Sequence, residues 1–140
     1  ALAEKTGGSL IILPSRRTPK RHLRGLSDQL GTTAHQIWDG KGDNPYPGVL
    51  GLADILAVTS DSVNMISEAC ITGKPVLPIP LAEETGRIAT FHQMMEERGH
   101  ILRLDDILSG KTALPKKMAI LDERAKIASQ IHAFFGVKPG

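Results

Sequence analysis

Short continuous apolar runs alternate along the chain with segments whose apolar residues recur at helical spacing. Residues 9–13 form one such run between Gly8 and Pro14, which is typical of a strand covered on both faces. Further runs of this kind predict strands over residues 35–38, 54–59, 75–79 and 101–104.

The segments between these runs have the character of helices. Thr18 can cap a helix that Pro19 begins and Gly31 ends, with leucines at positions 23, 26 and 30 as its apolar stripe. We also predict the last turns of a helix that ends at Gly7, and helices over residues 46–53, 61–72, 87–98 and 116–135.

This alternation of strand and helix predicts the fold class. Strands separated by helices form βαβ units with right-handed crossovers, so we expect an α/β, Rossmann-like, doubly wound parallel sheet. A length of 140 residues fits a single domain over residues 1–140. Ligands of such sheets bind at the carboxyl ends of the strands, so the strand-to-helix turns are where to look for a site.

Composition excludes several classes of protein. No apolar run approaches the roughly 20 residues that span a bilayer, and no signal-like layout opens the chain, so we expect a cytoplasmic protein. Cys70 has no His or Cys neighbour at metal-ligand spacing, so we expect a buried structural thiol and no metal. The glycine motifs of dinucleotide-binding proteins and P-loop enzymes are absent, and we expect no cofactor.

Positive charge is concentrated in one segment although the net charge is only +2. Nine residues without an acidic side chain contain five cations, namely Arg16, Arg17, Lys20, Arg21 and Arg24. We expect this segment either to meet an anionic partner or to be solvated by water. Nucleic acid is the least favoured partner, because the chain has few aromatic residues and no nucleic-acid-reading motif.

Two strand-to-helix turns are rich in hydroxyl groups and begin helices. A helix N-terminus offers unpaired N–H groups and partial positive charge, which suits a phosphate. The simpler interpretation is that the Ser, Thr and Asp side chains only cap the helices. The candidate phosphate-binding residues are Ser15, Arg16, Arg17 and Thr18 in the first turn and Ser60, Asp61, Ser62 and Asn64 in the second.

The helix that follows Asp61 has two distinct faces. Val63, Ile66 and Cys70 share one face, which we expect to be core, while Asn64 and Glu68 lie on the opposite one. Glu68 stands about 10 Å along the axis from the helix start, where the ribose of a bound nucleotide would lie. The alternative is a solvated glutamate on an exposed face.

Three stretches of the sequence resemble the mitochondrial-fission "elongated mitochondria" family, which has bacterial relatives. They are Ser15 to Pro19, the run Asn44 to Tyr46 followed by Leu52 to Ala69, and Thr72 to Val76. That family is in turn similar to GT-B glycosyltransferases, in which the C-terminal of two facing Rossmann-like domains holds a nucleotide-sugar donor.

This resemblance implies roles for particular residues. It assigns Ser62 to the diphosphate and Glu68 to the ribose of a donor such as a UDP-sugar, and it implies a missing N-terminal domain that would supply any catalytic base. Many such enzymes have paired glycines where this chain has Ser60 and Asp61. Loops that cover the base or sugar in these enzymes correspond to Thr85, Gly86, Arg87 and His92. For His92 the preferred interpretation is a partly exposed surface residue.

Other functions remain open at this point. The chain can be a non-enzymatic interaction module whose basic segment meets an acidic protein or a membrane surface, which would make it membrane-peripheral. It can also be a nucleotide-sugar epimerase, because epimerases share the fold. The first expectation remains a donor-binding, glycosyltransferase-like domain.

Overall fold

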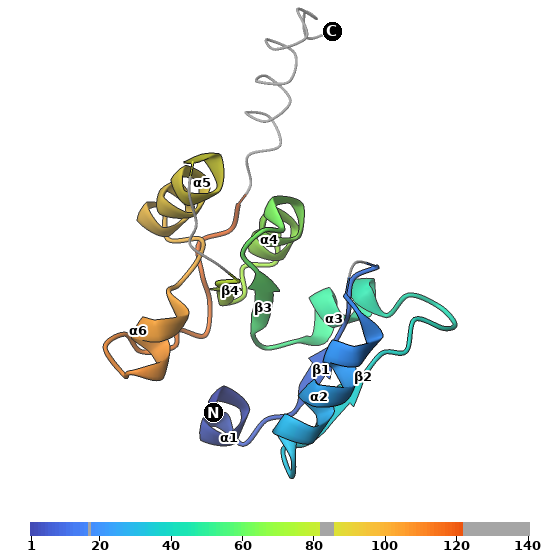
Figure 1. Ribbon diagram of the computed structural model, residues 1–140. Coiled ribbons are helices and arrows are strands. Elements are labelled where there is room, and N and C mark those ends of the chain that lie inside the picture. The colour runs from blue at the N-terminus through green and yellow to red at the C-terminus, as the bar shows by residue number, and fades with distance from the viewer. Residues whose placement is uncertain (17, 82–85, 122–140) are drawn as a thin grey trace, which may run out of the picture. The chain divides into compact units, whose positions relative to one another are not determined.

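The computed structural model describes residues 1–16, 18–81 and 86–121. The chain divides into two compact units, which we describe separately as the N-terminal unit, Ala1–Ala53, and the C-terminal unit, which begins at Asp54. Figure 1 shows the helices and strands of both.

The N-terminal unit is built on a pair of parallel strands. In chain order its elements are α1 (Leu2–Thr6), β1 (Leu10–Ile12), α2 (Lys20–Leu30), β2 (His35–Ile37) and α3 (Tyr46–Leu52). Leu10 lies opposite His35 in the parallel ladder, and the amide of Trp38 extends it by donating to the Ile12 carbonyl at 3.0 Å. The β1–α2–β2 segment is thus a βαβ unit, as predicted.

Helix α2 is attached to one face of this strand pair through His35. The imidazole Nδ1 lies 2.7 Å from the Thr33 carbonyl oxygen, which can only accept, so Nδ1 carries the proton. Nε2 therefore accepts from the Ser27 hydroxyl of α2 at 3.2 Å. On the other face Ile11 is 56% exposed, so the described residues of this unit do not cover that face of β1 as predicted.

The start of α2 differs from the sequence prediction. Pro19 is the N-cap, and no side chain caps the helix, so the predicted Thr18 cap is wrong. The reason is that the Thr18 hydroxyl accepts a hydrogen bond from the Ser15 amide at 3.2 Å, while the Thr18 amide donates to the Ser15 carbonyl at 3.0 Å. These bonds close a turn before the helix begins.

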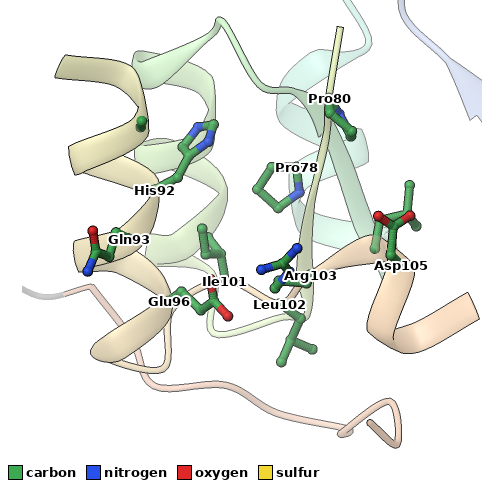
Figure 2. A pocket seen from close by; sticks show the side chains of 11 residues that line it. Pro78, Pro80, His92, Gln93, Glu96, Ile101, Leu102, Arg103 and Asp105 are labelled. Atoms are coloured by element: carbon green, nitrogen blue, oxygen red, sulfur yellow. The ribbon is translucent and has the colours of Figure 1, made fainter. Parts of the chain in front are cut away.

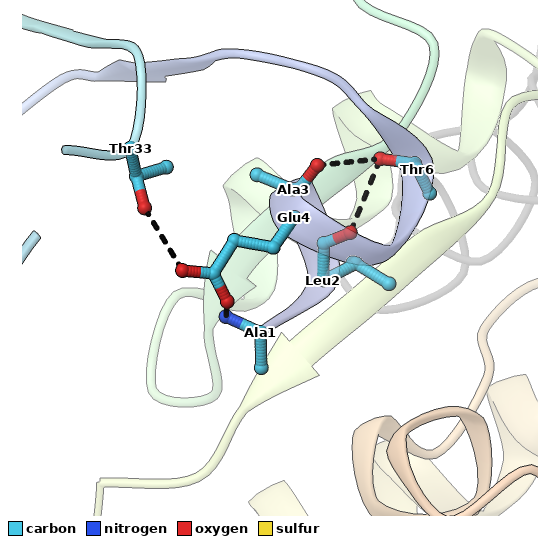
Figure 3. Close-up of polar contacts among 6 residues, drawn as sticks. All are labelled: Ala1, Leu2, Ala3, Glu4, Thr6 and Thr33. Carbon is cyan, nitrogen blue, oxygen red and sulfur yellow. Dashed lines mark hydrogen bonds and ion pairs between the residues drawn. The ribbon is translucent and has the colours of Figure 1, made fainter.

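Helix α1 ends at Gly7, whose φ of 64° is the left-handed conformation expected of a helix-ending glycine. The Thr33 hydroxyl donates to the Glu4 carboxylate at 3.3 Å (Figure 3), which ties α1 to the loop before β2.

The C-terminal unit contains a second parallel strand pair. Its elements are β3 (Leu56–Thr59), α4 (Val63–Ile71), β4 (Val76–Ile79), α5 (Gly86–Glu97) and α6 (Leu104–Leu108). Leu56 pairs with Val76 and Thr59 with Ile79. The two pairs confirm an α/β chain with parallel strands. That they form one doubly wound sheet in a single domain stays a prediction.

Most of the buried apolar side chains lie in the C-terminal unit. Ile66 and Cys70 on α4 are at most 1% exposed, which confirms the predicted core face of that helix. The other buried apolar residues of this unit are Leu56, Ala69, Val76, Leu77, Met95, Ile101, Ile107 and Leu121. This core packs α4 against both β3 and β4.

The Cys70 thiol belongs to this core, as predicted. Its Sγ donates to the His100 carbonyl at 3.4 Å. Burial raises the pKa of Cys70 to about 12, so the thiol stays protonated at neutral pH.

Two elements of the C-terminal unit were predicted wrongly. Residues 101–104 were predicted as a strand, but only the Leu102 amide joins β4, donating to the Val76 carbonyl at 3.0 Å. Leu104 already begins α6, where Asp105 and Asp106 stand in the first turn and favour a helix start.

The second error concerns the predicted helix over residues 116–135. Residues 116–121 are not helical, and the remainder lies outside the described residues. The Met118 amide donates to the Gly73 carbonyl at 2.8 Å and the Leu121 amide to the Cys70 carbonyl at 3.1 Å. These bonds to the end of α4 hold residues 118–121, hereafter the strap, in an extended path.

Gly73 makes the close approach of the strap possible. Its φ is 71°, and a Cβ there would lie 2.9 Å from Cγ1 of Ile120. The His100 Nδ1 donates to the Ala119 carbonyl at 2.9 Å from the other side. Among the described residues, no helix is both long and apolar enough to cross a membrane.

Candidate functional site

The β3–α4 turn fixes the residues predicted to hold phosphate in the C-terminal unit. The Ser60 amide donates to the Ile79 carbonyl at 2.9 Å and the Ser62 amide to the Thr59 carbonyl at 3.1 Å, so the turn is tied to both strands. Ser60 is only 3% exposed. Asp61, in contrast, is exposed.

Helix α4 begins without a side-chain cap. Ser62 is the N-cap, and its hydroxyl makes no capping hydrogen bond. The first helical bond runs from the Ile66 amide to the Ser62 carbonyl at 3.0 Å. Within residues 1–16, 18–81 and 86–121, no acceptor binds the amides of Val63, Asn64 and Met65. Three donors therefore stand at the positive end of the helix dipole.

The outer face of α4 carries the remaining predicted residues of this turn. Asn64 and Glu68 are exposed, opposite the buried Ile66 and Cys70. Glu68 lies six positions after Ser62, or about 9 Å along a helix axis. The spacing assumed for the ribose is thus present on this face, and the role of Glu68 stays a prediction.

The first predicted turn belongs to the N-terminal unit. Ser15 and Thr18 are engaged with each other, their hydroxyl oxygens 3.2 Å apart. Arg16 is exposed and its side chain makes no ion pair or hydrogen bond with the described part of the chain. Arg17 lies outside the described residues. Because the two turns belong to different units, their convergence on one ligand stays a prediction.

The third predicted group surrounds the start of α5. Thr85 lies outside the described residues, Gly86 begins the helix with a φ of 62°, and Arg87 is exposed. His92 is only 8% exposed, so the alternative of a partly exposed surface histidine is wrong. Its ring lies 5.7 Å from that of Phe91.

His92 lines an open pocket of about 470 Å³ between β4, α5 and the start of α6 (Figure 2). Apolar side chains form much of the wall, and the polar groups come from α5 and from the segment that leads into α6. The lining polar residues are His92, Gln93, Glu96, Arg103 and Asp105. Donors and acceptors thus stand over an apolar wall, which is the usual composition of a small-molecule site.

Sequence reasoning missed four of these five polar residues. His92 and Glu96 lie four apart on α5 and so share a face, which was a usable signal. Arg103 was hidden because residues 101–104 were predicted as a strand, and Asp105 because the helix that begins at Leu104 was not predicted. In the described residues no three His, Cys, Asp or Glu side chains gather in a way that could hold a metal ion.

The pocket is close to the α4 turn along the backbone. The Ile79 carbonyl that accepts from Ser60 is followed directly by Pro80, which lines the pocket. Both features therefore lie at the carboxyl end of β4, the position at which open α/β sheets bind ligands.

Comparisons with known proteins give the family. The sequence model of the family described as Mitochondrial fission ELM1 matches residues 1–135. The Mitochondrial fission protein ELM1 of Arabidopsis thaliana is 42% identical over 95 residues, which cover 67% of this chain and 22% of that protein. No solved structure matches. The chain therefore belongs to the mitochondrial fission ELM1 family, and it spans about a fifth of the length of this relative.

Proposed function

We propose that this chain is the donor-binding part of a glycosyltransferase-like protein of GT-B architecture and that it binds a nucleotide-diphosphate sugar. The observation that carries the proposal is the start of α4, where three backbone amides have no acceptor among the described residues and the Ser62 hydroxyl makes no capping bond. A phosphate supplies acceptors for these donors and a negative charge for the helix dipole.

The remaining parts of the ligand follow from this anchor. With a phosphate at Ser62, the exposed Glu68 carboxylate can accept from both ribose hydroxyls. The adjoining pocket with His92 takes the sugar or the base, together with Thr85, Gly86 and Arg87. We further propose hydrogen bonds to the phosphates from Ser15, Arg16, Arg17 and Thr18. A guanidinium group can donate two parallel hydrogen bonds to two phosphate oxygens.

The carboxylate of Asp61 opposes diphosphate binding at the start of α4. An exposed carboxylate beside the start of α4 repels a diphosphate, and the described residues give Asp61 no cationic partner. Replacing it by Asn removes the repulsion and keeps the shape of the side chain. We therefore expect Asp61→Asn to tighten nucleotide-sugar binding several-fold.

The chemistry assigned to this chain is electrostatic. When the bond between sugar and diphosphate breaks, negative charge grows on the leaving diphosphate, and the amides at the start of α4 stabilise it more than they stabilise the intact donor. The catalytic base belongs to the partner domain of the architecture, across the cleft. Transfer itself is thus a proposal about the longer protein.

Titration with a UDP-sugar, followed by amide chemical shifts, tests the binding step. We expect saturable shifts from Ser60 to Glu68 and a roughly tenfold weaker dissociation constant for Ser62→Ala. Ser109→Ala is the matched control, because Ser109 is an exposed serine at the end of α6 and should leave binding unchanged.

The outcome that contradicts the proposal is the absence of any shift at millimolar nucleotide sugar. That result would favour a non-enzymatic interaction module. If binding is observed, product analysis with the full-length protein separates transfer from epimerisation, since an epimerase returns the nucleotide sugar with one inverted carbon.

A further inference from the structure

Helix α2 carries three cations on one side, Lys20, Arg21 and Arg24, which we call the basic face. At about 100° per residue these positions span an arc of roughly 100° over the first turns of the helix. All three side chains are exposed, whereas the leucines at positions 23, 26 and 30 are half-buried toward the strands. The basic face therefore points away from the packed side of α2.

Folding gains nothing from this arrangement. None of the three side chains makes an ion pair or a hydrogen bond with the described residues. Asp28 lies one turn beyond Arg24 and forms no ion pair with it. The first turn of α2 contains no acidic residue, so the cations stand at the positive end of the helix dipole, where positive charge is unfavourable.

Charge is also distributed unevenly along the chain. Residues 1–53 contain seven Lys and Arg against four Asp and Glu, whereas residues 54–140 contain ten against eleven. The positive charge of the protein is therefore concentrated in the unit that presents the basic face. An anionic partner would gain from both the local cluster and the surrounding field.

The composition of the exposed side of α2 distinguishes among anionic partners. Its other members are His22, Gly25, Asp28 and Gln29, so it contains no apolar side chain and no aromatic one apart from the His22 imidazole. Stable protein interfaces depend on such anchors in a desolvated centre, and single-stranded nucleic acids need aromatic side chains for stacking. A membrane surface with anionic headgroups needs neither, because cations above it are attracted without inserting.

We infer that the basic face of α2 docks the protein on an anionic phospholipid surface. Lys20, Arg21 and Arg24 lie over the lipid phosphates and carboxylates, and no part of the helix enters the hydrocarbon. The inference does not depend on nucleotide-sugar binding, because Arg16, Arg17 and the α4 residues are not part of the basic face.

Vesicle co-sedimentation tests this inference. We expect binding to phosphatidylcholine vesicles that contain about 30% phosphatidylserine, and none to phosphatidylcholine alone. The variant Lys20→Gln, Arg21→Gln, Arg24→Gln should bind about 100-fold more weakly, at about fivefold for each cation lost. Binding should also weaken as salt is raised, because ions screen the attraction.

A matched control separates the basic face from overall charge. Lys111→Gln, Lys116→Gln, Lys117→Gln removes three exposed cations from the C-terminal unit and should leave vesicle binding within about twofold of the original. Circular dichroism checks that both variants keep their helices, and Gln is a good helix former. A control variant that loses as much binding as the α2 variant would overturn the inference.

Further results would also overturn it. One is equal binding to neutral and anionic vesicles. Another is binding to an acidic peptide or to RNA that depends on the basic face while vesicles stay unbound, since that would assign the face to a different partner. UDP-sugar titration of the α2 variant should be unchanged, so failure of the docking inference and failure of donor binding can be told apart.

Discussion

Helices α2 and α4 each follow a parallel strand, and both begin without a side-chain cap, yet they differ in packing and in charge. Helix α4 buries Ile66, Ala69 and Cys70 and has Asp61 just before its N-cap. Helix α2 buries no residue fully and carries cations through its first turns. Burial of one face fixes α4, so its N-terminal backbone N–H groups keep their positions. Helix α2 instead presents a charged surface.

The largest expected effect is the loss of stability when a packed side chain is truncated, and it tests whether α4 is packed more firmly than α2. Ile66 is fully buried, so Ile66→Ala should lower the free energy of unfolding of the C-terminal unit by about 2–5 kcal/mol. Leu26 on α2 is half-buried, so Leu26→Ala should cost clearly less, about 1 kcal/mol. Urea unfolding, monitored through hydrogen exchange at individual amides, measures both changes in the free energy of unfolding. Equal costs would show that α2 is packed as firmly as α4.

The next effect concerns the end of α4. Gly73→Ala places a Cβ 2.9 Å from Ile120 at a positive φ, and it should lower the free energy of unfolding by about 2 kcal/mol or more. Gly110→Ala is the control, because Gly110 has a φ of 78° and no heavy atom within 4 Å of a Cβ. It should cost only about 1 kcal/mol. If thermal unfolding gives the same cost for both, the strap does not constrain this glycine.

The smallest effect tests charge at the start of α2. Lys20→Glu exchanges an unfavourable cation for a favourable anion in the first turn and should stabilise the helix by about 0.3–1 kcal/mol at low salt. Gln29→Glu, in the last turn, should have the opposite sign. Thermal midpoints at low and high salt measure both changes, and a gain for Lys20→Glu that persists in high salt would argue against the dipole explanation.

Local patterns predicted most of the helices and strands. Runs of apolar residues placed β1, β2, β3 and β4 within two residues of their observed bounds, and the glycines that end α1 and α4 were identified from sequence. These features depend on residues close together in the chain, and such residues are visible in a single sequence.

The errors arise where distant residues decide the structure. The strap is held by hydrogen bonds from the Leu121 and Met118 amides to the carbonyls of Cys70 and Gly73. Each donor lies about 45–50 residues from its acceptor along the chain, so no local sequence pattern predicts these bonds. The Thr18 hydroxyl accepts a hydrogen bond from the Ser15 amide instead of capping α2. Both are local side-chain-to-backbone bonds, and the sequence pattern does not decide between them.

The candidate site was only partly visible in the sequence. The faces of α4 followed from its periodicity, and the absent cap at Ser62 could not be foreseen because serine is a common capping residue. The polar pocket residues come from α5 and from the start of α6, and no sequence pattern links Glu96 with Arg103 or Asp105.

The strap has a consequence for the order in which the protein is made. Helix α4 and strand β4 leave the ribosome well before residues 118–121, so during synthesis the Cys70 and Gly73 carbonyls lack the amides that later bind them. The nascent C-terminal unit would complete its packing only after Leu121 has emerged. Until then only water can supply the hydrogen bonds that these two carbonyls later accept from the strap.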